Sequence, residues 1–320
     1  MRRLRLAVVA IASFAGGCAV PATPNVAAPA TRAAAKPAAS SGSDFLYVAE
    51  SGGNYAYAFT YPDGKLINKI SSGIAGAVGL CSDSAGNVYV TSTQTGAIVE
   101  YAHGASSPSA TFYEDTKKGG HPNGCSVDPT TGNLAVADGI NNSLAIFTGP
   151  SDFGTYYDLA SMSGATSCGF DDRGNLFVDG PRTTSGSGFV LAELPKGAKA
   201  LKRLELDKHI EQPGTVAWDG TRVTVGAIDA AGSALYRLTI SGTHATVVGT
   251  TPLGGEKTIG QSAIYASHVI APYAVKGEYR DRVGVWSYPA GGKGTSILQR
   301  SGALFYGVAI STGSPLRVRQ

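Results

Sequence analysis

The polar residues best placed to do chemistry follow short apolar runs of the kind that form β-strands. They recur at similar points after successive runs, so we expect them to gather on one loop-rich, ligand-binding face. The ten candidates are Glu50, His121, Asn123, Asp138, Asn142, Asp179, Arg182, Asp229, Tyr273 and Arg280. Acids at strand ends also commonly bond nearby backbone N–H groups. Asp138 and Asp179 therefore fit a second interpretation, in which they only shape turns.

A hard divalent cation such as Ca²⁺ needs several oxygen ligands at once. The positions that lead into the expected inner strands are Val78, Asn123, Thr166, Gly214, Ser262 and Tyr306. This set offers one amide, that of Asn123, and no carboxylate. Asn123 is therefore an isolated metal candidate, and we predict no cofactor. Bound Ca²⁺ is the alternative, because Glu50 and Asp179 could reach inward from other loops.

Three cysteines of the main body, Cys81, Cys125 and Cys168, lie in expected inner strands. They form no C-x-x-C pair, so a zinc site is not expected. Cys81 is out of phase with the other two by one residue and should point to the opposite face of its sheet. We predict three buried thiols that pack as small apolar residues; a Cys125–Cys168 bridge is the alternative. No G-x-S-x-G or H-E-x-x-H motif occurs, so no catalytic residue is predicted.

The N-terminus has the order of a secretory signal peptide, with three arginines in the first five residues and a short apolar run, Leu6–Phe14. Small residues then lead to Cys18. This stretch resembles the lipobox of bacterial lipoproteins, in which the cysteine sulfur receives a diacylglyceryl group. The resemblance implies a signal peptide over residues 1–17, lipidation of Cys18 and, from Ala19, an outer-membrane or cell-surface location. The alternative is ordinary cleavage that discards Cys18 and leaves a periplasmic or secreted protein.

Residues 18–43 contain the lipidation cysteine followed by a stretch rich in Ala and Pro, which is typical of a semi-rigid tether. The first 43 residues carry five of the 26 Lys and Arg residues and none of the 23 acids. The rest of the chain is therefore close to neutral and has no basic run. A nucleic-acid partner is not expected, and contact with a membrane is expected only through a lipid anchor.

Short β-strand patterns recur along the body at intervals of 42 to 47 residues. The recurring runs are Leu46–Val48, Val88–Val90, Leu134–Val136, Leu176–Val178, Val223–Val225 and Val269–Ala271. A period in the forties built from short strands, without a helical period, is typical of a β-propeller. We predict an all-β, six-bladed propeller of four-stranded blades over residues 44–312, followed by a tail over 313–320.

Within each unit, an inner strand ends at an Asp, and a Gly-containing turn leads to the recurring run. Asp supplies backbone acceptors in such turns and Gly supplies positive φ. A third strand follows at Tyr55–Phe59, Ala97–Tyr101, Ser143–Phe147, Gly188–Leu194, Ala234–Ile240 and Arg282–Tyr288. The first unit has no inner strand of its own. We therefore expect the C-terminal run, Phe305–Ser311, to pair beside Leu46–Ala49 and close the ring.

The segments Pro122–Asp128 and Gly132–Asp138, with Asn141 and Asn142, resemble an NHL repeat, and the other units are looser versions. The chain is similar to TolB-like six-bladed propellers, near the NHL-repeat and senescence-marker/gluconolactonase groups. That resemblance implies either a metal-dependent lactonase or a plain binding scaffold. In the lactonases, a Glu and an Asp with Asn hold a divalent cation, and only Asn123 matches that set.

The sequence as a whole favours a non-enzymatic, membrane-tethered scaffold that binds an unknown protein or small ligand on its loop-rich face, as a monomer. A lactonase-like hydrolase that uses a divalent metal is one alternative. A structural component of the cell envelope is another.

Overall fold

The computed structural model describes residues 42–115, 120–158, 160–183, 188–229, 232–254, 258–275 and 279–313. The chain separates into two compact units, Met1–Ala38 and Ala39–Gln320, and every described residue belongs to the second. The predicted signal peptide (1–17), Cys18, the tether as far as residue 41 and tail residues 314–320 lie outside the described residues. No helix in the described part of the chain is long and apolar enough to cross a membrane.

The described residues form β-strands and no helix, which confirms the all-β prediction. Three sheets are separate, four-stranded and antiparallel. The first contains β25 (Phe305–Ser311), β1 (Phe45–Glu50), β2 (Tyr55–Thr60) and β3 (Leu66–Ile70). The second contains β4 (Ala77–Ser82), β5 (Val88–Ser92), β6 (Ala97–Tyr101) and β7 (Ala110–Tyr113), and the third contains β8 (Pro122–Val127), β9 (Leu134–Asp138), β10 (Ser143–Phe147) and β11 (Thr155–Asp158).

The remaining strands form three antiparallel sets that short parallel pairings join into one large sheet. The first set contains β12 (Ser167–Phe170), β13 (Leu176–Pro181), β14 (Phe189–Leu194) and β15 (Lys202–Leu206). The second contains β16 (Gln212–Trp218), β17 (Val223–Asp229), β18 (Gly232–Ser241) and β19 (His244–Gly254). The third contains β20 (Thr258–Ile259), β21 (Ala263–Tyr265), β22 (His268–Ala274), β23 (Arg282–Ser287) and β24 (Gly291–Gln299). The joining pairs, β15–β19 and β19–β24, each involve two residue pairs.

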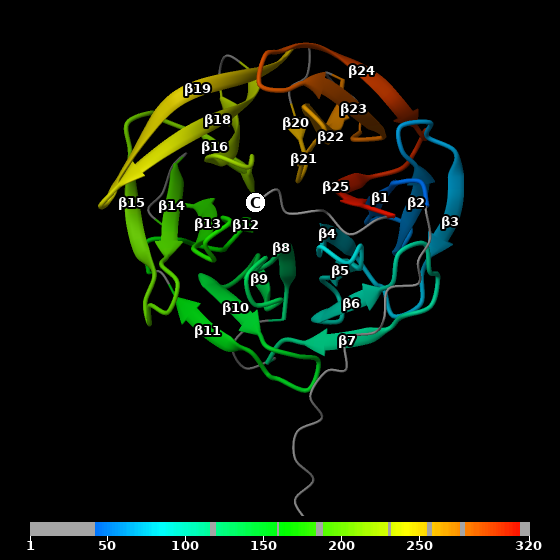
Figure 1. Cartoon of the computed structure of the whole chain (residues 1–320), viewed down its shortest axis with the longest axis horizontal. Coiled ribbons are helices and arrows are strands. Elements are labelled where there is room, and N and C mark those ends of the chain that lie inside the picture. The colour runs from blue at the N-terminus through cyan, green and yellow to red at the C-terminus, as the bar shows by residue number, and fades with distance from the viewer. Residues whose placement is uncertain are drawn as a thin grey trace, which may run out of the picture. The chain divides into compact units, whose positions relative to one another are not determined.

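The sheets stand around a common centre, as the blades of a β-propeller do (Figure 1). Strands β4, β8, β12 and β25 lie nearest the centre, while β3, β7, β11, β15, β19 and β24 lie at the periphery (Figure 1). The apolar side chains fill the spaces between neighbouring sheets. For example, Leu80 and Val90 pack in one cluster with Tyr47 and Ala309, which belong to the preceding sheet.

The turns between inner and second strands have the predicted chemistry. The Asp83 carboxylate accepts hydrogen bonds from the backbone N–H groups of Ala85 and Asn87, each at 2.9 Å. Asp128, Asp171 and Asp219 accept equivalent bonds in their own turns. These bonds satisfy donors that a tight turn would otherwise leave unpaired, so each Asp fixes the start of the next strand.

The inner strands come close enough to require small side chains. A Cβ atom on Gly79 would lie 1.9 Å from the carbonyl oxygen of Asn123 in the next sheet. One on Gly124 would lie 2.7 Å from the Cα atom of Ser167 in the sheet after that. Glycine at these two positions therefore lets the inner strands of neighbouring sheets approach each other near the centre.

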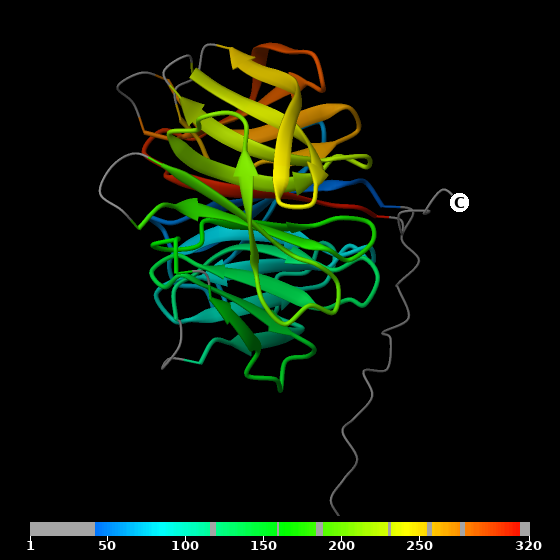
Figure 2. The same ribbon diagram turned by 90° about the vertical axis from the view of Figure 1, so that its left-hand side faces the viewer.

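The C-terminal strand β25 lies beside β1, although about 260 residues separate them in the sequence (Figure 2). The two strands are antiparallel, with Leu46 opposite Ile310 and Val48 opposite Val308. A register shift after Val48 places Glu50 opposite Phe305. Both ends of the described chain therefore contribute to one four-stranded sheet.

The prediction of three free thiols was wrong, because Cys81 and Cys125 form a disulfide with Cα atoms 5.6 Å apart. Each sheet has two faces that pack against different neighbours. Cys125 and Cys168 are in phase, so both point toward the preceding sheet and cannot meet each other. Cys81 is out of phase, so it points toward the following sheet and meets Cys125 across the interface. Cys168 is the buried free thiol among the described residues.

Candidate functional site

Asp138 ends β9 and is fully buried. Its Oδ1 atom accepts hydrogen bonds from the backbone N–H groups of Ile140 and Asn141, at 2.9 and 2.8 Å. Its Oδ2 atom accepts one from Gly120 at 3.1 Å. The carboxylate thus organises two loops, as in the turn-forming interpretation of the sequence.

Asp179 lies one position earlier in its own second strand, β13, and is also fully buried. Its Oδ1 atom accepts a hydrogen bond from the Ser167 backbone at 2.9 Å. Thr91 makes the same contact in its own sheet, where its hydroxyl accepts a bond from Gly79 at 2.7 Å. Burial raises the pKa of Asp179 to about 8. A hydroxyl at the equivalent position makes this bond equally well, which indicates that Asp179 supports the inner strand.

Glu50, at the end of β1, is buried and accepts a hydrogen bond from the backbone of Leu304 at 3.1 Å. It therefore braces the segment that leads into β25. Glu50, Asp138 and Asp179 belong to three different sheets. None of the three is presented to solvent, and no group of three or more His, Cys, Asp or Glu side chains suited to a metal ion occurs within the described ranges.

Of the other candidates, His121 and Asn123 lie beside the Asp138 turn. The carbonyl oxygen of His121 accepts a bond from Gly139 at 2.9 Å, and the Asn123 amide lies against the same glycine. His121, Asn123 and Asp138 are therefore predicted residues that lie together in the structure. Asn142 is partly buried in the adjoining loop. Asp229 ends β17, and its side chain lies outside what the structure describes.

Tyr273 and Arg280 belong to the last set of strands and the segment beside it. Tyr273 is buried against Trp286, with the ring centres 5.6 Å apart in an edge-to-face arrangement. It is a packing residue. Arg280 lies with its guanidinium 4.2 Å from the centre of the Tyr306 ring on β25, which is a cation–π distance.

Glu114 was missed from the sequence. It follows the outer strand β7, is 3% exposed, and accepts a hydrogen bond from Gly120 at 3.0 Å. That N–H is the one that Asp138 also accepts, so two buried carboxyl groups share a single donor. Burial and the neighbouring Asp138 raise the pKa of Glu114 to about 8. Outer strands are the least regular part of each unit, and no pattern in the sequence pointed to this residue.

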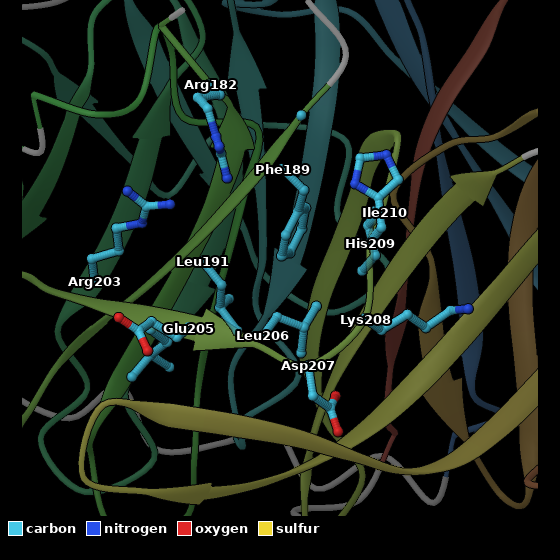
Figure 3. A pocket seen from close by; sticks show the side chains of 12 residues that line it. Arg182, Phe189, Leu191, Arg203, Glu205, Leu206, Asp207, Lys208, His209 and Ile210 are labelled. Atoms are coloured by element: carbon cyan, nitrogen blue, oxygen red, sulfur yellow. The ribbon is translucent and has the colours of Figure 1, made fainter.

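One predicted residue, Arg182, lines a cavity of about 350 Å³. We call this cavity the rim pocket. It lies between the end of β13, strands β14 and β15, and the segment from Glu205 to Ile210 that leads to β16. In Figure 3, the Arg182 and Arg203 side chains extend toward each other from opposite sides, with Phe189 beside them. His209, another lining residue, stands on the far side of Phe189 (Figure 3).

The acidic side chains that line the rim pocket are engaged with the neighbouring β18–β19 hairpin. Glu205 lies 3.3 Å from the His244 ring, and Asp207 accepts a hydrogen bond from the Val247 backbone at 3.0 Å. In contrast, the guanidinium groups of Arg182 and Arg203 make no ion pair with any described residue. The pocket therefore has two arginines that form no ion pair with a described acid.

No protein-family model and no curated protein matches this chain. Several solved structures are similar to it. A chain in the crystal structure of a nidogen/laminin complex, a β-propeller, has a TM-score of 0.67 and 13% identity over 85% of this chain and 99% of its own. A protein of unknown function from Bacteroides caccae has a TM-score of 0.58 and 12% identity, over 84% of this chain and 99% of its own.

The hydrazine synthase of Kuenenia stuttgartiensis is also similar, with a TM-score of 0.57 and 11% identity over 76% of this chain and 73% of that one. At these identities the likeness concerns the fold alone. The chain is a β-propeller, and its function has to be argued from its own residues.

Proposed function

We propose that this protein is an exported binding module, a rigid propeller that presents its loop-rich face to a protein or small ligand without catalysing a reaction. The observation that carries the proposal is that the three acids predicted on the loop-rich face hold loops and strands in place. Glu50, Asp138 and Asp179 are buried acceptors for backbone N–H groups, whereas Arg182 remains exposed. Loops held in this way are fixed before a ligand arrives, which lowers the entropy cost of binding.

We further propose that the propeller has six blades and that β25 closes the ring. Six sets of strands, each with one inner strand paired to a recurring second strand, support this count. The pairing of β25 with β1 supports the closure. The motif at Pro122–Asp138 supports a place among the TolB-like, NHL-repeat propellers.

A lactonase needs a metal site, and the described residues do not fit one. The inner-strand entry positions supply the amide of Asn123 and no carboxylate, and the buried acids already accept backbone hydrogen bonds. We therefore expect the purified chain, stripped with a chelator and refilled with Ca²⁺ or Zn²⁺, to take up no stoichiometric metal and to turn over no lactone from a panel. Calorimetric titration measures the metal uptake, and a lactone hydrolysis assay measures the turnover. Uptake of one ion at micromolar concentration, together with turnover, would establish the enzyme instead.

The binding function has its own test. The immobilised chain is exposed to envelope extract, and captured material is compared for the wild type, R182E and R173E. Arg173 is exposed at the opposite end of the same sheet. R182E and R173E both replace an arginine by a glutamate, so they change the net charge equally but on different faces. Material captured by the wild type and R173E but lost with R182E supports binding through the face. Capture that does not differ between the three would favour a structural envelope component.

Anchoring is a separate proposal, for an outer-membrane or cell-surface lipoprotein. It rests on the arginine-rich start, the apolar run and Ala15–Cys18. We expect C18S to release the protein from the membrane fraction and to abolish labelling by a radioactive fatty acid. A single acyl chain binds membranes only marginally, whereas the two chains of a diacylglyceryl group give stable attachment. Wild-type protein that is already soluble in the periplasm or medium would contradict lipidation.

A further inference from the structure

We propose that the rim pocket binds an organic anion, namely a carboxylate or phosphate monoester attached to a small apolar group. The inference rests on the proposed binding function and names a ligand class for one part of the loop-rich face.

The charge of the pocket selects the anion. Arg182 and Arg203 extend toward the same space (Figure 3), and neither is paired with an acid among the described residues. Like charges brought together without a counter-ion repel one another, so an anion that lies between them removes that cost. The planar guanidinium fork matches two oxygen atoms of a carboxylate or phosphate.

Two acids, Glu205 and Asp207, also line the pocket and keep their negative charge, but their contacts are with the neighbouring β18–β19 hairpin. The Glu205 carboxylate lies 3.3 Å from the His244 ring, and Asp207 accepts a hydrogen bond from the Val247 backbone at 3.0 Å. Lys208 is also drawn away, with its ammonium group 4.8 Å from the centre of the Tyr236 ring. Glu205, Asp207 and Lys208 thus contact residues of the β18–β19 hairpin, whereas Arg182 and Arg203 form no ion pair with a described residue.

Apolar side chains form the other part of the lining. Phe189, Leu191, Leu204 and Ile210 all line the pocket and are at most 8% exposed. A volume of about 350 Å³ lies at the lower end of the range for small-molecule sites. A ligand with one anionic group and one small ring or short alkyl group matches both the charge and the size.

The backbone holds both arginines in place. Arg203 lies in β15 and pairs with Ala192 of β14. Arg182 forms a bridge with Met162, and its N–H donates to the carbonyl of Gly188 at 3.0 Å. No backbone ordering is then needed at these two positions when a ligand binds, which lowers the entropy cost of binding.

The test uses the purified full chain and four probes: phenyl phosphate, benzoate, inorganic phosphate and benzyl alcohol. Calorimetry or ligand-observed NMR measures each affinity. We expect phenyl phosphate or benzoate to bind more tightly than inorganic phosphate, and benzyl alcohol to bind at least about tenfold more weakly than the better anion. R182A and R203A should each weaken that binding by about five- to tenfold, and added salt should weaken it too. The better of the two aromatic anions identifies the headgroup.

The matched control is R173A, which removes the same charge at the opposite end of the sheet. Equal weakening by R173A would show that general electrostatic attraction, and not the pocket, explains the binding. Equal affinity for benzyl alcohol, or no binding of either aromatic anion at 10 mM (about the weakest measurable affinity), would overturn the proposal. Chemical conversion of a bound probe would contradict the non-enzymatic function but leave the binding site intact.

Discussion

At the scale of single residues, the buried carboxyl groups are the groups whose environment differs most from water. Asp179 and Glu114 both have a pKa raised to about 8, first of all by burial. Glu114 also faces Asp138, with which it shares the Gly120 N–H. Desolvation penalises the charged form of an acid, and a neighbouring carboxylate adds to the penalty. Burial therefore favours the neutral form of both side chains, and it outweighs the backbone hydrogen bonds, which favour the charged form.

This environment predicts a pH dependence of stability. Between the ordinary pKa of Glu114 near 4.5 and its folded value of about 8, the folded state holds a proton that the unfolded state has released. The free energy of unfolding should therefore fall as pH rises through that window. E114Q keeps an acceptor for Gly120 and cannot ionise. It should match the wild type at pH 5 and be more stable by roughly 1–4 kcal/mol at pH 9.

Urea unfolding at pH 5, 7 and 9 measures the difference. Asp179 lowers stability with rising pH in the same way. The free energy of unfolding of E114Q should therefore still fall as pH rises, but less steeply than that of the wild type. The control is D172N, which removes an exposed acid near the opposite end of a sheet. If the curves of wild type and E114Q stay parallel across the window, Glu114 does not titrate as described.

At the scale of the elements, strand positions could be predicted because local chemistry determines them. The third strands at Ala97–Tyr101 and Ser143–Phe147 occur residue for residue where the pattern placed them. Turn residues with an obligatory conformation, such as Asp83 followed by Gly86 with φ of 85°, bound these strands. Because these strands are buried on both faces, alternation within a strand then decides which neighbouring sheet each side chain faces.

Contacts between elements could not be predicted in the same way. The sequence correctly placed Cys81 on the opposite face of its sheet from that of Cys125 in its own sheet. The prediction of free thiols ignored that neighbouring sheets present opposite faces to each other, which brings the two cysteines together. The rim pocket depends on the register of β14 and β15, which brings Arg203 near Arg182 across 20 intervening residues. Neither fact has a local signature. Of the candidate site, the sequence therefore predicted which strand ends carry polar groups, but not which of them face solvent.

At the scale of the whole molecule, β25 links the two ends of the body. It pairs with β1, and its Ile310 carbonyl accepts a hydrogen bond at 2.8 Å from Ser82 on β4. Gln261 donates its N–H to Tyr306 at 2.8 Å, and its side chain bonds Leu80. One strand thus connects the first, second and last sets of strands.

Removal of β25 should therefore cost much of the stability. Deletion of residues 304–320 exposes the unpaired edge of β1 and the apolar surface that Val308, 2% exposed, covers. V308D should have a similar effect, because an unpaired buried charge costs several kcal/mol against a typical total of about 5–15 kcal/mol. Deletion of 313–320 keeps all of β25 and, among the described residues, removes the hydrogen bond that the Gly313 N–H donates to Asp44. Thermal melts of the three variants should show large losses for the first two and a shift of a few degrees for the third. A 304–320 deletion that melts close to wild type would mean that the ring does not depend on its C-terminal strand, and the six-blade closure would have to be abandoned.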